Sequence, residues 1–437
     1  MGGNFVNLLA YFTPREVHQN KGGRRMKKRF SFAFLTAIIL AVMWAAVAGA
    51  EDIVIGYTGP LSGPAAEYGQ DCVNGIDMAV NEINSKGGII VKGKKYTFRF
   101  EKMDDKINPE LTVANAQKLR KEHKAIAIFN PVFGNLTALM KMNTEKKNEF
   151  LVMAYTSVPQ VAEMGNKLTV TLTMPFTIYT KIEAQLAWEK GWRKCAMVVT
   201  AGAYGEAWRK VFGDTWVKKG GVITADKPAN YYTRTDFTVP LSEALATHPD
   251  FLLIGGPSAT TAMIIEQARA KGFEGGFVLI DQAKLDAIQQ VMQKPLGLEG
   301  CIGTAKVTDV PYPASAQFIE KYKDLYKRSV TWESIINYTS THALALAIAE
   351  AGTADNVYAI RGAFPRVFPM LGDRYPMEFH AMTPNGRMLC MAVVQTMKHG
   401  KFTQPYLYAW WTKSQKEADK LKKITKGSTQ IVFMNID

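Results

Sequence analysis

The chain has 437 residues, of which 47% are hydrophobic, so it is long and apolar enough to bury large cores. Its formal net charge of +14 is spread along the sequence, and no basic block is interleaved with aromatic residues, which argues against nucleic-acid binding. The four cysteines contain no C-x-x-C pair, which excludes the common zinc and redox motifs, and we expect buried free thiols, with one disulfide as the alternative (Cys72, Cys195, Cys301 and Cys390).

The first 50 residues end in a predicted secretory signal peptide. Residues 27–29 are basic, residues 32–47 are almost without polar side chains, and Ala48-Gly49-Ala50 fits a small-residue cleavage site. We therefore expect export, a mature start at Glu51 and, because no cysteine lies near this site, no lipid anchor. A transmembrane anchor is the alternative, which the small-residue exit disfavours.

Removal of this leader would leave 387 residues. The leader carries seven basic residues and one acidic residue, so 46 basic and 38 acidic residues remain, a net charge of +8 that suits a solvated surface. A chain of this length exceeds the usual size of a single core, so we expect two lobes.

Strand-like and helix-like segments alternate along the mature chain. Several predicted strands are continuous apolar runs, which is typical of parallel strands covered on both faces. The pattern predicts a doubly wound α/β architecture. The predicted strands are residues 53–55, 96–100, 125–129, 150–154, 195–200, 222–224, 251–254, 277–280 and 301–307, and the predicted helices cover residues 72–83, 109–123, 179–190, 205–219, 240–247, 259–271 and 314–327.

Ligands of open α/β sheets bind beyond the carboxyl ends of the strands, close to the starts of the helices. The loops that follow the predicted strands are therefore the candidate binding segments. They are residues 56–68, 130–136, 155–159, 201–205, 255–258 and 281–284.

The opening segment, IGYTGPLSGPAAEYGQ followed by NGIDMAVNEINSKGGI, closely resembles the opening of periplasmic type I solute-binding proteins of the leucine/isoleucine/valine-binding group. Further matches follow in order along the chain. The resemblance covers roughly residues 51–350. The ordered matches are Asp104-Asp105, ANAQKL at 114–119, Asn130 to Gly134, Ala203-Tyr204-Gly205, Asp236-Phe237, Gly255-Gly256 and Gln267-Ala268-Arg269.

This resemblance implies two lobes joined by a hinge that the chain crosses three times. Lobe one would comprise residues 51–173 and 303–382, and lobe two residues 174–302 and 383–437. A small amino acid or an apolar or aromatic carboxylate would be trapped between the lobes by hinge closure. The implied protein is a periplasmic monomer that delivers ligand to an inner-membrane ABC permease, with no cofactor and no metal.

The resemblance also implies which residues meet the polar groups of a ligand. Gly134 and Ser157 match positions that bind a ligand carboxylate, although Gly134 lacks the hydroxyl common there, and a tight turn is its alternative role. Asp281 matches the acidic residue that meets a ligand ammonium. A cap on the following helix is the alternative role of Asp281.

Tyr68 and Tyr204 match aromatic walls of the family cleft. Two departures from the family pattern bear on the ligand. Pro257 replaces an aromatic residue that closes the pocket of branched-chain binders, and Tyr155 occupies a place usually held by a small residue. We therefore expect a reshaped, aromatic-rich pocket whose best ligand is not leucine, isoleucine or valine.

Two other classes of function remain as alternatives. A secreted α/β enzyme is disfavoured, because the common catalytic motifs are missing and the adjacent residues Asp104 and Asp105 should point to opposite faces of a strand. A sensory receptor normally needs a membrane span and a signalling domain, which we do not find in this sequence. A free binding protein that feeds a signalling partner remains open.

Overall fold

The computed structural model describes residues 51–292, 295–310, 312–426 and 431–432. The predicted signal peptide lies outside these residues. Within them, helices long and apolar enough to cross a membrane are not found.

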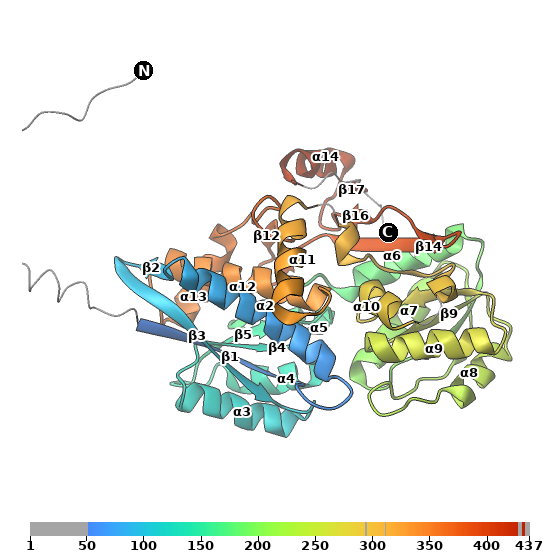
Figure 1. The fold of residues 1–437 in the computed structure, drawn as a ribbon, viewed down its shortest axis with the longest axis horizontal. Coiled ribbons are helices and arrows are strands. Elements are labelled where there is room, and N and C mark those ends of the chain that lie inside the picture. The colour runs from blue at the N-terminus through green and yellow to red at the C-terminus, as the bar shows by residue number, and fades with distance from the viewer. Residues whose placement is uncertain (1–50, 293–294, 311, 427–430, 433–437) are drawn as a thin grey trace, which may run out of the picture. The chain divides into compact units, whose positions relative to one another are not determined.

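The first sheet has six strands in the order β2-β3-β1-β4-β5-β6. All neighbours pair in parallel except β2 and β3, which form an antiparallel edge. In Figure 1, helices α2, α12 and α13 lie on one side of this sheet, and α3 and α4 lie on the other. The strands are β1 (Glu51–Gly59), β2 (Ile89–Val91), β3 (Lys94–Asp104), β4 (Ala127–Asn130), β5 (Leu151–Ala154) and β6 (Thr169–Thr171), and the helices are α2 (Ala66–Ser85), α3 (Pro109–Lys121), α4 (Phe133–Met142), α5 (Pro159–Glu163), α12 (Trp332–Ala351) and α13 (Val357–Ala363).

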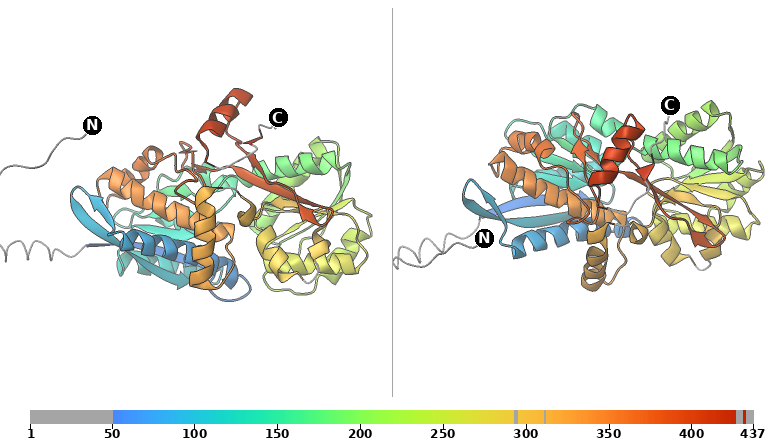
Figure 2. Two further views of the ribbon diagram at one scale, coloured as in Figure 1. Left: turned by 45° about the horizontal axis from the view of Figure 1, so that its top comes forward. Right: turned by 90° about the horizontal axis from the view of Figure 1, so that it is seen from above.

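The second sheet has nine strands among the described residues, in the order β17-β16-β14-β11-β10-β9-β7-β8 with β15 paired to β14. Strands β7 to β11 are parallel, whereas β14 is antiparallel to β11 and β16. Figure 2 shows β14, in red, running beside the other strands of this sheet. The strands are β7 (Lys194–Val199), β8 (Val222–Asp226), β9 (Phe251–Gly255), β10 (Gly276–Leu279), β11 (Ile302–Thr304), β14 (Ala392–Lys398), β15 (Lys401–Phe402), β16 (Tyr406–Tyr408) and β17 (Ile431–Val432).

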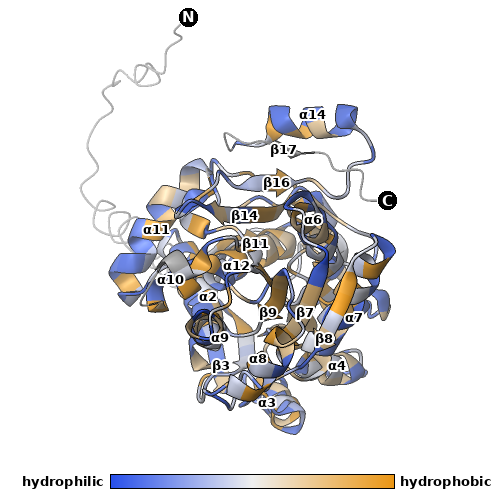
Figure 3. Cartoon of the chain, turned by 90° about the vertical axis from the view of Figure 1, so that its right-hand side faces the viewer, coloured by the Kyte–Doolittle hydropathy of each residue, from blue (hydrophilic) through white to orange (hydrophobic). Residues whose placement is uncertain are grey.

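Residues of the second sheet alternate between two apolar cores, as side chains of a strand must. In β7, Cys195 and Met197 pack into the core that contains Trp208, whereas Ala196 packs with Ile264 on the opposite face. Figure 3 shows β9 and β14 in hydrophobic colours between helices with mixed faces. The helices are α6 (Phe176–Glu189), α7 (Ala203–Lys218), α8 (Thr238–Leu245), α9 (Ser258–Ala270) and α10 (Leu285–Val291).

The remaining elements connect the sheets or extend the chain beyond them. Helix α11 follows the second sheet and precedes α12, and the short pair β12–β13 precedes β14. They are η1 (Pro295–Leu298), η2 (Val307–Asp309), α11 (Pro313–Tyr326), η3 (Phe364–Arg366), β12 (Ala381–Met382), β13 (Met388–Leu389) and α14 (Gln415–Ile424).

The predicted doubly wound α/β class is confirmed, and each predicted strand and helix has a counterpart. The strand predicted at 301–307 is wrong in length, because the chain leaves the sheet after Thr304 and turns into η2. Helix α12 and strand β14 were not predicted. All four cysteines are buried and free.

The predicted lobe limits need a local correction where the chain crosses between the sheets. Gly303 and Thr304 pair with β14, so they belong to the second sheet rather than to the first lobe. Arg387 forms a bridge with Thr171 of the first sheet. Elsewhere the limits stay a prediction.

Candidate functional site

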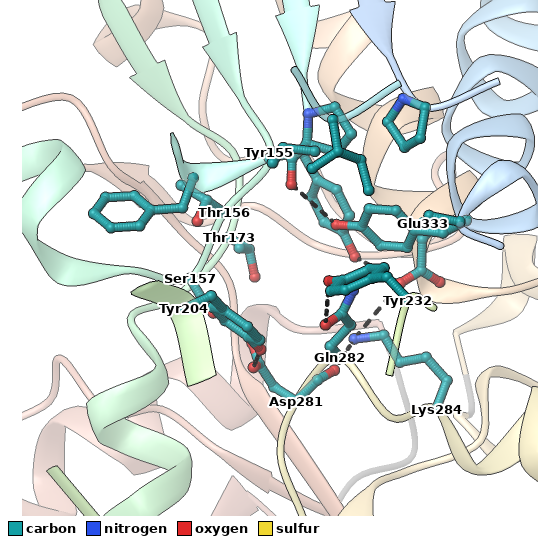
Figure 4. A pocket seen from close by; sticks show the side chains of 17 residues that line it. Tyr155, Thr156, Ser157, Thr173, Tyr204, Tyr232, Asp281, Gln282, Lys284 and Glu333 are labelled. Carbon is teal, nitrogen blue, oxygen red and sulfur yellow. Dashed lines mark hydrogen bonds and ion pairs between the residues drawn. The ribbon is translucent and has the colours of Figure 1, made fainter. Parts of the chain in front are cut away.

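A cavity lies where the carboxyl ends of strands from both sheets meet. Its space between atoms is about 610 Å³, part of it open to solvent. The first sheet contributes the loops after β1, β4, β5 and β6, and the second contributes α7 and the loop after β10 (Figure 4). The lining residues are Pro60, Ala65, Tyr68, Ile107, Pro131, Val132, Phe133, Tyr155, Thr156, Ser157, Thr173, Tyr204, Tyr232, Asp281, Gln282, Lys284 and Glu333.

The structure brings five of the six predicted ligand-binding residues into this cavity: Tyr68, Tyr155, Ser157, Tyr204 and Asp281. They come from separate elements, because parallel strands present their following loops at the same edge of the sheet. Gly134 is not among the lining residues. It lies exposed in the first turn of α4.

Asp281 is a buried carboxylate, and its contacts come from the second sheet. Both Tyr204, through its hydroxyl, and Trp208, through Nε1 at 3.0 Å, donate to Oδ1 of Asp281. Asp281 does not cap α10, whose N-cap residue is Lys284 and which has no side-chain cap. Among the described residues, no donor to Oδ2 of Asp281 is found, which leaves this oxygen for a ligand.

Glu333 and Lys284 form a charged pair in the cavity wall that sequence reasoning missed. The Nζ atom of Lys284 lies 3.8 Å from Oε1 of Glu333 and donates to the backbone carbonyl of Asp281. Glu333 begins α12 beside the first sheet, and Lys284 follows β10 of the second, so this pair joins the two halves of the site. The capping box of Thr331 and Ser334 was the local signal that could have marked this helix start.

Four tyrosines form rigid walls of the cavity. Their hydroxyls are held by the chain: Tyr68 donates to the carbonyl of Pro131 at 3.2 Å, and Tyr155 donates to Glu333 at 3.2 Å. Tyr204 donates to Asp281, while the hydroxyl of Tyr232 pairs with the amide of Gln282. Burial raises the pKa of all four, so they stay neutral and offer ring faces to a ligand.

Hydroxyls line one side of the cavity, and charged groups line the other. Figure 4 shows Thr156, Ser157 and Thr173 facing the side that carries Glu333 and Lys284. No hydrogen bond of the Ser157 hydroxyl is found within the described part of the chain. This arrangement suits a ligand with an anionic group at the hydroxyls and a cationic group at the carboxylates.

A metal site would need several His, Cys, Asp or Glu side chains close together. The described residues contain no cluster of three or more His, Cys, Asp or Glu side chains suited to a metal ion. Asp104 and Asp105 diverge as predicted. Asp104 accepts from the backbone of Leu61 at 2.9 Å, whereas Asp105 is buried and accepts from Thr112 at 2.9 Å.

Comparison with known proteins decides the family. A family model described as periplasmic binding protein matches residues 52–407. The chain belongs to the periplasmic binding protein family. The resemblance predicted from the opening segment is thereby confirmed.

Individual members of the family agree with this assignment. The Leu/Ile/Val/Thr-binding protein of Salmonella typhimurium is 27% identical over 56% of this chain, and the match spans 66% of that protein's length. The LivJ substrate-binding protein of Streptococcus pneumoniae, solved with isoleucine, is 20% identical with a TM-score of 0.67 over 82% of this chain and 99% of LivJ. A solute-binding protein of R. palustris, solved with benzoate, is 16% identical with a TM-score of 0.67 over 81% of this chain and 95% of that one.

The two solved structures show the shared fold. The structure shows where the two residues that depart from the family pattern, Gly134 and Pro257, lie. The backbone of Gly134 does not require glycine, because its φ is not positive and a Cβ would meet no atom within 4 Å. The tight-turn role predicted as its alternative is therefore not seen. Pro257 precedes α9 and lines a second cavity beside the first.

Proposed function

We propose that this chain is the extracytoplasmic solute-binding receptor of an ABC importer and that it traps an amino acid between its two lobes by hinge closure. Export through the predicted signal peptide would place it in the periplasm, where it would deliver ligand to a membrane permease. It binds its ligand and does not turn it over.

One observation carries the proposal: loops from both sheets enclose a cavity that is lined by the hydroxyl of Ser157, for which no partner is found among the described residues, and by the carboxylates of Asp281 and Glu333. An amino acid carries a carboxylate and an ammonium, and both need partners when buried. The Ser157 side of the cavity supplies donors for the carboxylate. Asp281 lines the cavity, and its Oδ2, which has no donor among the described residues, supplies an acceptor for the ammonium.

An amine-free acid is the alternative ligand, since a relative of this fold is solved with benzoate. Lys284 is the lining cation that could meet such an anion, but its ammonium already donates to the Asp281 carbonyl and lies near Glu333. A buried anion beside Asp281 and Glu333 would add a third negative charge, which low-polarity surroundings disfavour. The charges of the cavity lining therefore favour an amino acid over an amine-free acid as the ligand.

A thermal-shift panel on protein expressed from the full-length chain tests the proposal. The panel pairs each amino acid with the same acid lacking its amine, such as leucine with 4-methylpentanoate and phenylalanine with 3-phenylpropionate, and it includes basic amino acids and benzoate. A ligand at ~100 times its dissociation constant adds about 2.7 kcal/mol, enough to raise the midpoint by a few degrees.

A shift with amino acids alone supports the proposal. A shift with amine-free acids alone overturns the amino acid as ligand and leaves Asp281 a structural residue. Uptake of the same ligand by cells with and without this chain tests the importer role, and unchanged uptake would count against it.

A further inference from the structure

A second cavity adjoins the first and shares Tyr68, Gln282 and Glu333 with it. Its space between atoms is about 440 Å³, again partly open to solvent. The two cavities are therefore neighbours, with these three side chains in both linings. The lining residues are Pro64, Glu67, Tyr68, Asp71, Pro257, Ser258, Ala259, Gln282, Ala287, Thr331 and Glu333.

Several acidic groups belong to the lining of this second cavity. Its lining residues carry three carboxyl groups, the aliphatic hydroxyls of Ser258 and Thr331, the phenol of Tyr68 and one amide. Its apolar surface comes from prolines, alanines and one tyrosine ring, without a single Leu, Ile, Val, Phe or Met. Most of the exposed lining area is nonetheless apolar, so the cavity can hold the methylene groups of a long side chain as well as its polar end.

The outer carboxyl groups already have a cationic partner from the chain. Arg328 lies 2.9 Å from Glu67 and 3.1 Å from Asp71. Glu333 has no guanidinium partner: Tyr155 donates to its Oε1, and Lys284 lies 3.8 Å from that same oxygen. In the described part of the chain no donor to Oε2 of Glu333 is found, although the side chain is only 4% exposed.

The charges buried at the junction of the two cavities do not balance. Asp281, Lys284 and Glu333 are each at most 8% exposed, and together they carry two negative charges and one positive charge. A zwitterionic ligand leaves this excess negative charge in place. A ligand with one further positive charge cancels it, and cancelling a buried charge is strongly favourable.

We propose that the ligand is an α-amino acid with a positively charged side chain, whose cationic group enters the second cavity and binds Glu333. This inference rests on the proposed function, because the α-carboxylate and α-ammonium of the ligand occupy the first cavity. Glu333 is then the residue that determines specificity. Asp71 and Glu67 line the same cavity but are already paired with Arg328.

Isothermal titration of protein expressed from the full-length chain, with pairs of amino acids of which one carries a side-chain positive charge and the other does not, tests the charge requirement. Arginine is compared with citrulline, and lysine with norleucine, because each pair differs in one positive charge. We expect the charged member of the preferred pair to bind at least about tenfold more tightly, as a charge-assisted hydrogen bond to a buried carboxylate should provide.

The substitution Glu333→Gln removes the negative charge and retains an oxygen that can accept from Tyr155. It should reduce the preference for the charged member to about threefold or less and leave the binding of the neutral member nearly unchanged. Glu82→Gln is the matched control: Glu82 lies on α2, pairs with Lys86 and lines neither cavity, so the preference should persist.

The outcomes separate this inference from the proposed function. Equal or tighter binding of citrulline and norleucine overturns the inference but leaves an amino-acid receptor. Failure of every amino acid to bind overturns both. Should Glu333→Gln fail to fold, the comparison within each pair on the unaltered protein still decides the matter.

Discussion

Asp105 and Asp281 are buried carboxylates that follow parallel strands, one in each sheet, yet their surroundings differ in kind. Asp105 accepts hydrogen bonds from five groups of its own chain on both of its oxygens. Asp281 accepts two, both on Oδ1. The donors to Asp105 are the side chains of Thr58, Thr112, Asn130 and Asn135 and the backbone N–H of Ile107.

This difference separates a structural carboxylate from a binding one. Asp105 ties together β1, α3, β4 and α4, and it has no lone pair turned to a cavity. Asp281 is held by two donors to Oδ1 and lines the cavity, and among the described residues no donor to its Oδ2 is found. A buried acceptor left without a partner is costly, so its position beside a cavity indicates a ligand.

The largest effect is expected from Asp105→Ala. This substitution leaves several buried donors without an acceptor, so the free energy of unfolding should fall by roughly 3 kcal/mol or more. Urea denaturation measures it. The neighbouring substitution Asp104→Ala removes a part-exposed group and should cost only about 1 kcal/mol. Equal losses for the two would show that the Asp105 network is not what stabilises this edge of the sheet.

The second effect is on binding rather than stability. Asp281→Asn keeps an oxygen for Tyr204 and Trp208 but removes the negative charge that faces the ligand. The affinity for an amino acid should fall at least about tenfold, which corresponds to ~1.5–3 kcal/mol. Titration calorimetry measures the affinity, and urea denaturation should show a smaller loss than for Asp105→Ala. Unchanged affinity would refute the role of Asp281 as the ammonium partner.

Asp71 lies between these extremes, because it is held by the chain and also lines the second cavity. Burial raises its pKa to about 7; nearby Arg328 and Thr331 act in the opposite direction, while Glu333 and Glu67 add to the rise. Tyr322 also donates to it, at 3.2 Å. Asp71 is therefore partly protonated at neutral pH in the folded protein.

The sign of its effect on stability follows from its raised pKa. Between the unfolded pKa of about 4 and the folded pKa of about 7, the folded chain holds a proton that the unfolded chain has lost. Asp71 therefore lowers the free energy of unfolding as the pH rises, by at most about 1.4 kcal/mol per pH unit, and the fall ends only once the pH has passed above the folded pKa. Asp71→Asn should flatten this fall. Urea denaturation of both proteins across this range measures the difference, and parallel curves would contradict the assignment.

The fold could be predicted because each strand leaves a local pattern in the sequence, a short apolar run followed by a polar loop. The same loops held five cavity residues, since the ends of parallel strands meet at one edge. Helix α12 escaped prediction because 15 of its 20 residues are buried, so no polar stripe marks a period of 3.6. Glu333 was missed with it.

Lys284 was missed for a different reason. A lysine after a strand is typical of an exposed loop, and only the approach of Glu333 from a distant helix shows that this one is buried. Pairing between distant segments depends on tertiary structure and leaves no local pattern. The sequence therefore predicted which strand ends surround the cavity, but it did not predict that Lys284 and Glu333 pair in the cavity wall.

The smallest effect is expected from Gly134→Ser, which adds the hydroxyl that the family commonly has at this position. A side chain here meets no atom within 4 Å, and serine in the first turn of a helix is at least as favourable as glycine, so the free energy of unfolding should change by less than about 0.5 kcal/mol. Because Gly134 lies outside the cavity lining, the affinity should also stay within about threefold, measured by the same titration as for Asp281→Asn. A tenfold gain in affinity would show that hinge closure brings residue 134 onto the ligand. The contrast between Asp105 and Asp281 would then need revision. An exposed residue of α4, beside the first sheet, would contribute as much to binding as the carboxylate of Asp281.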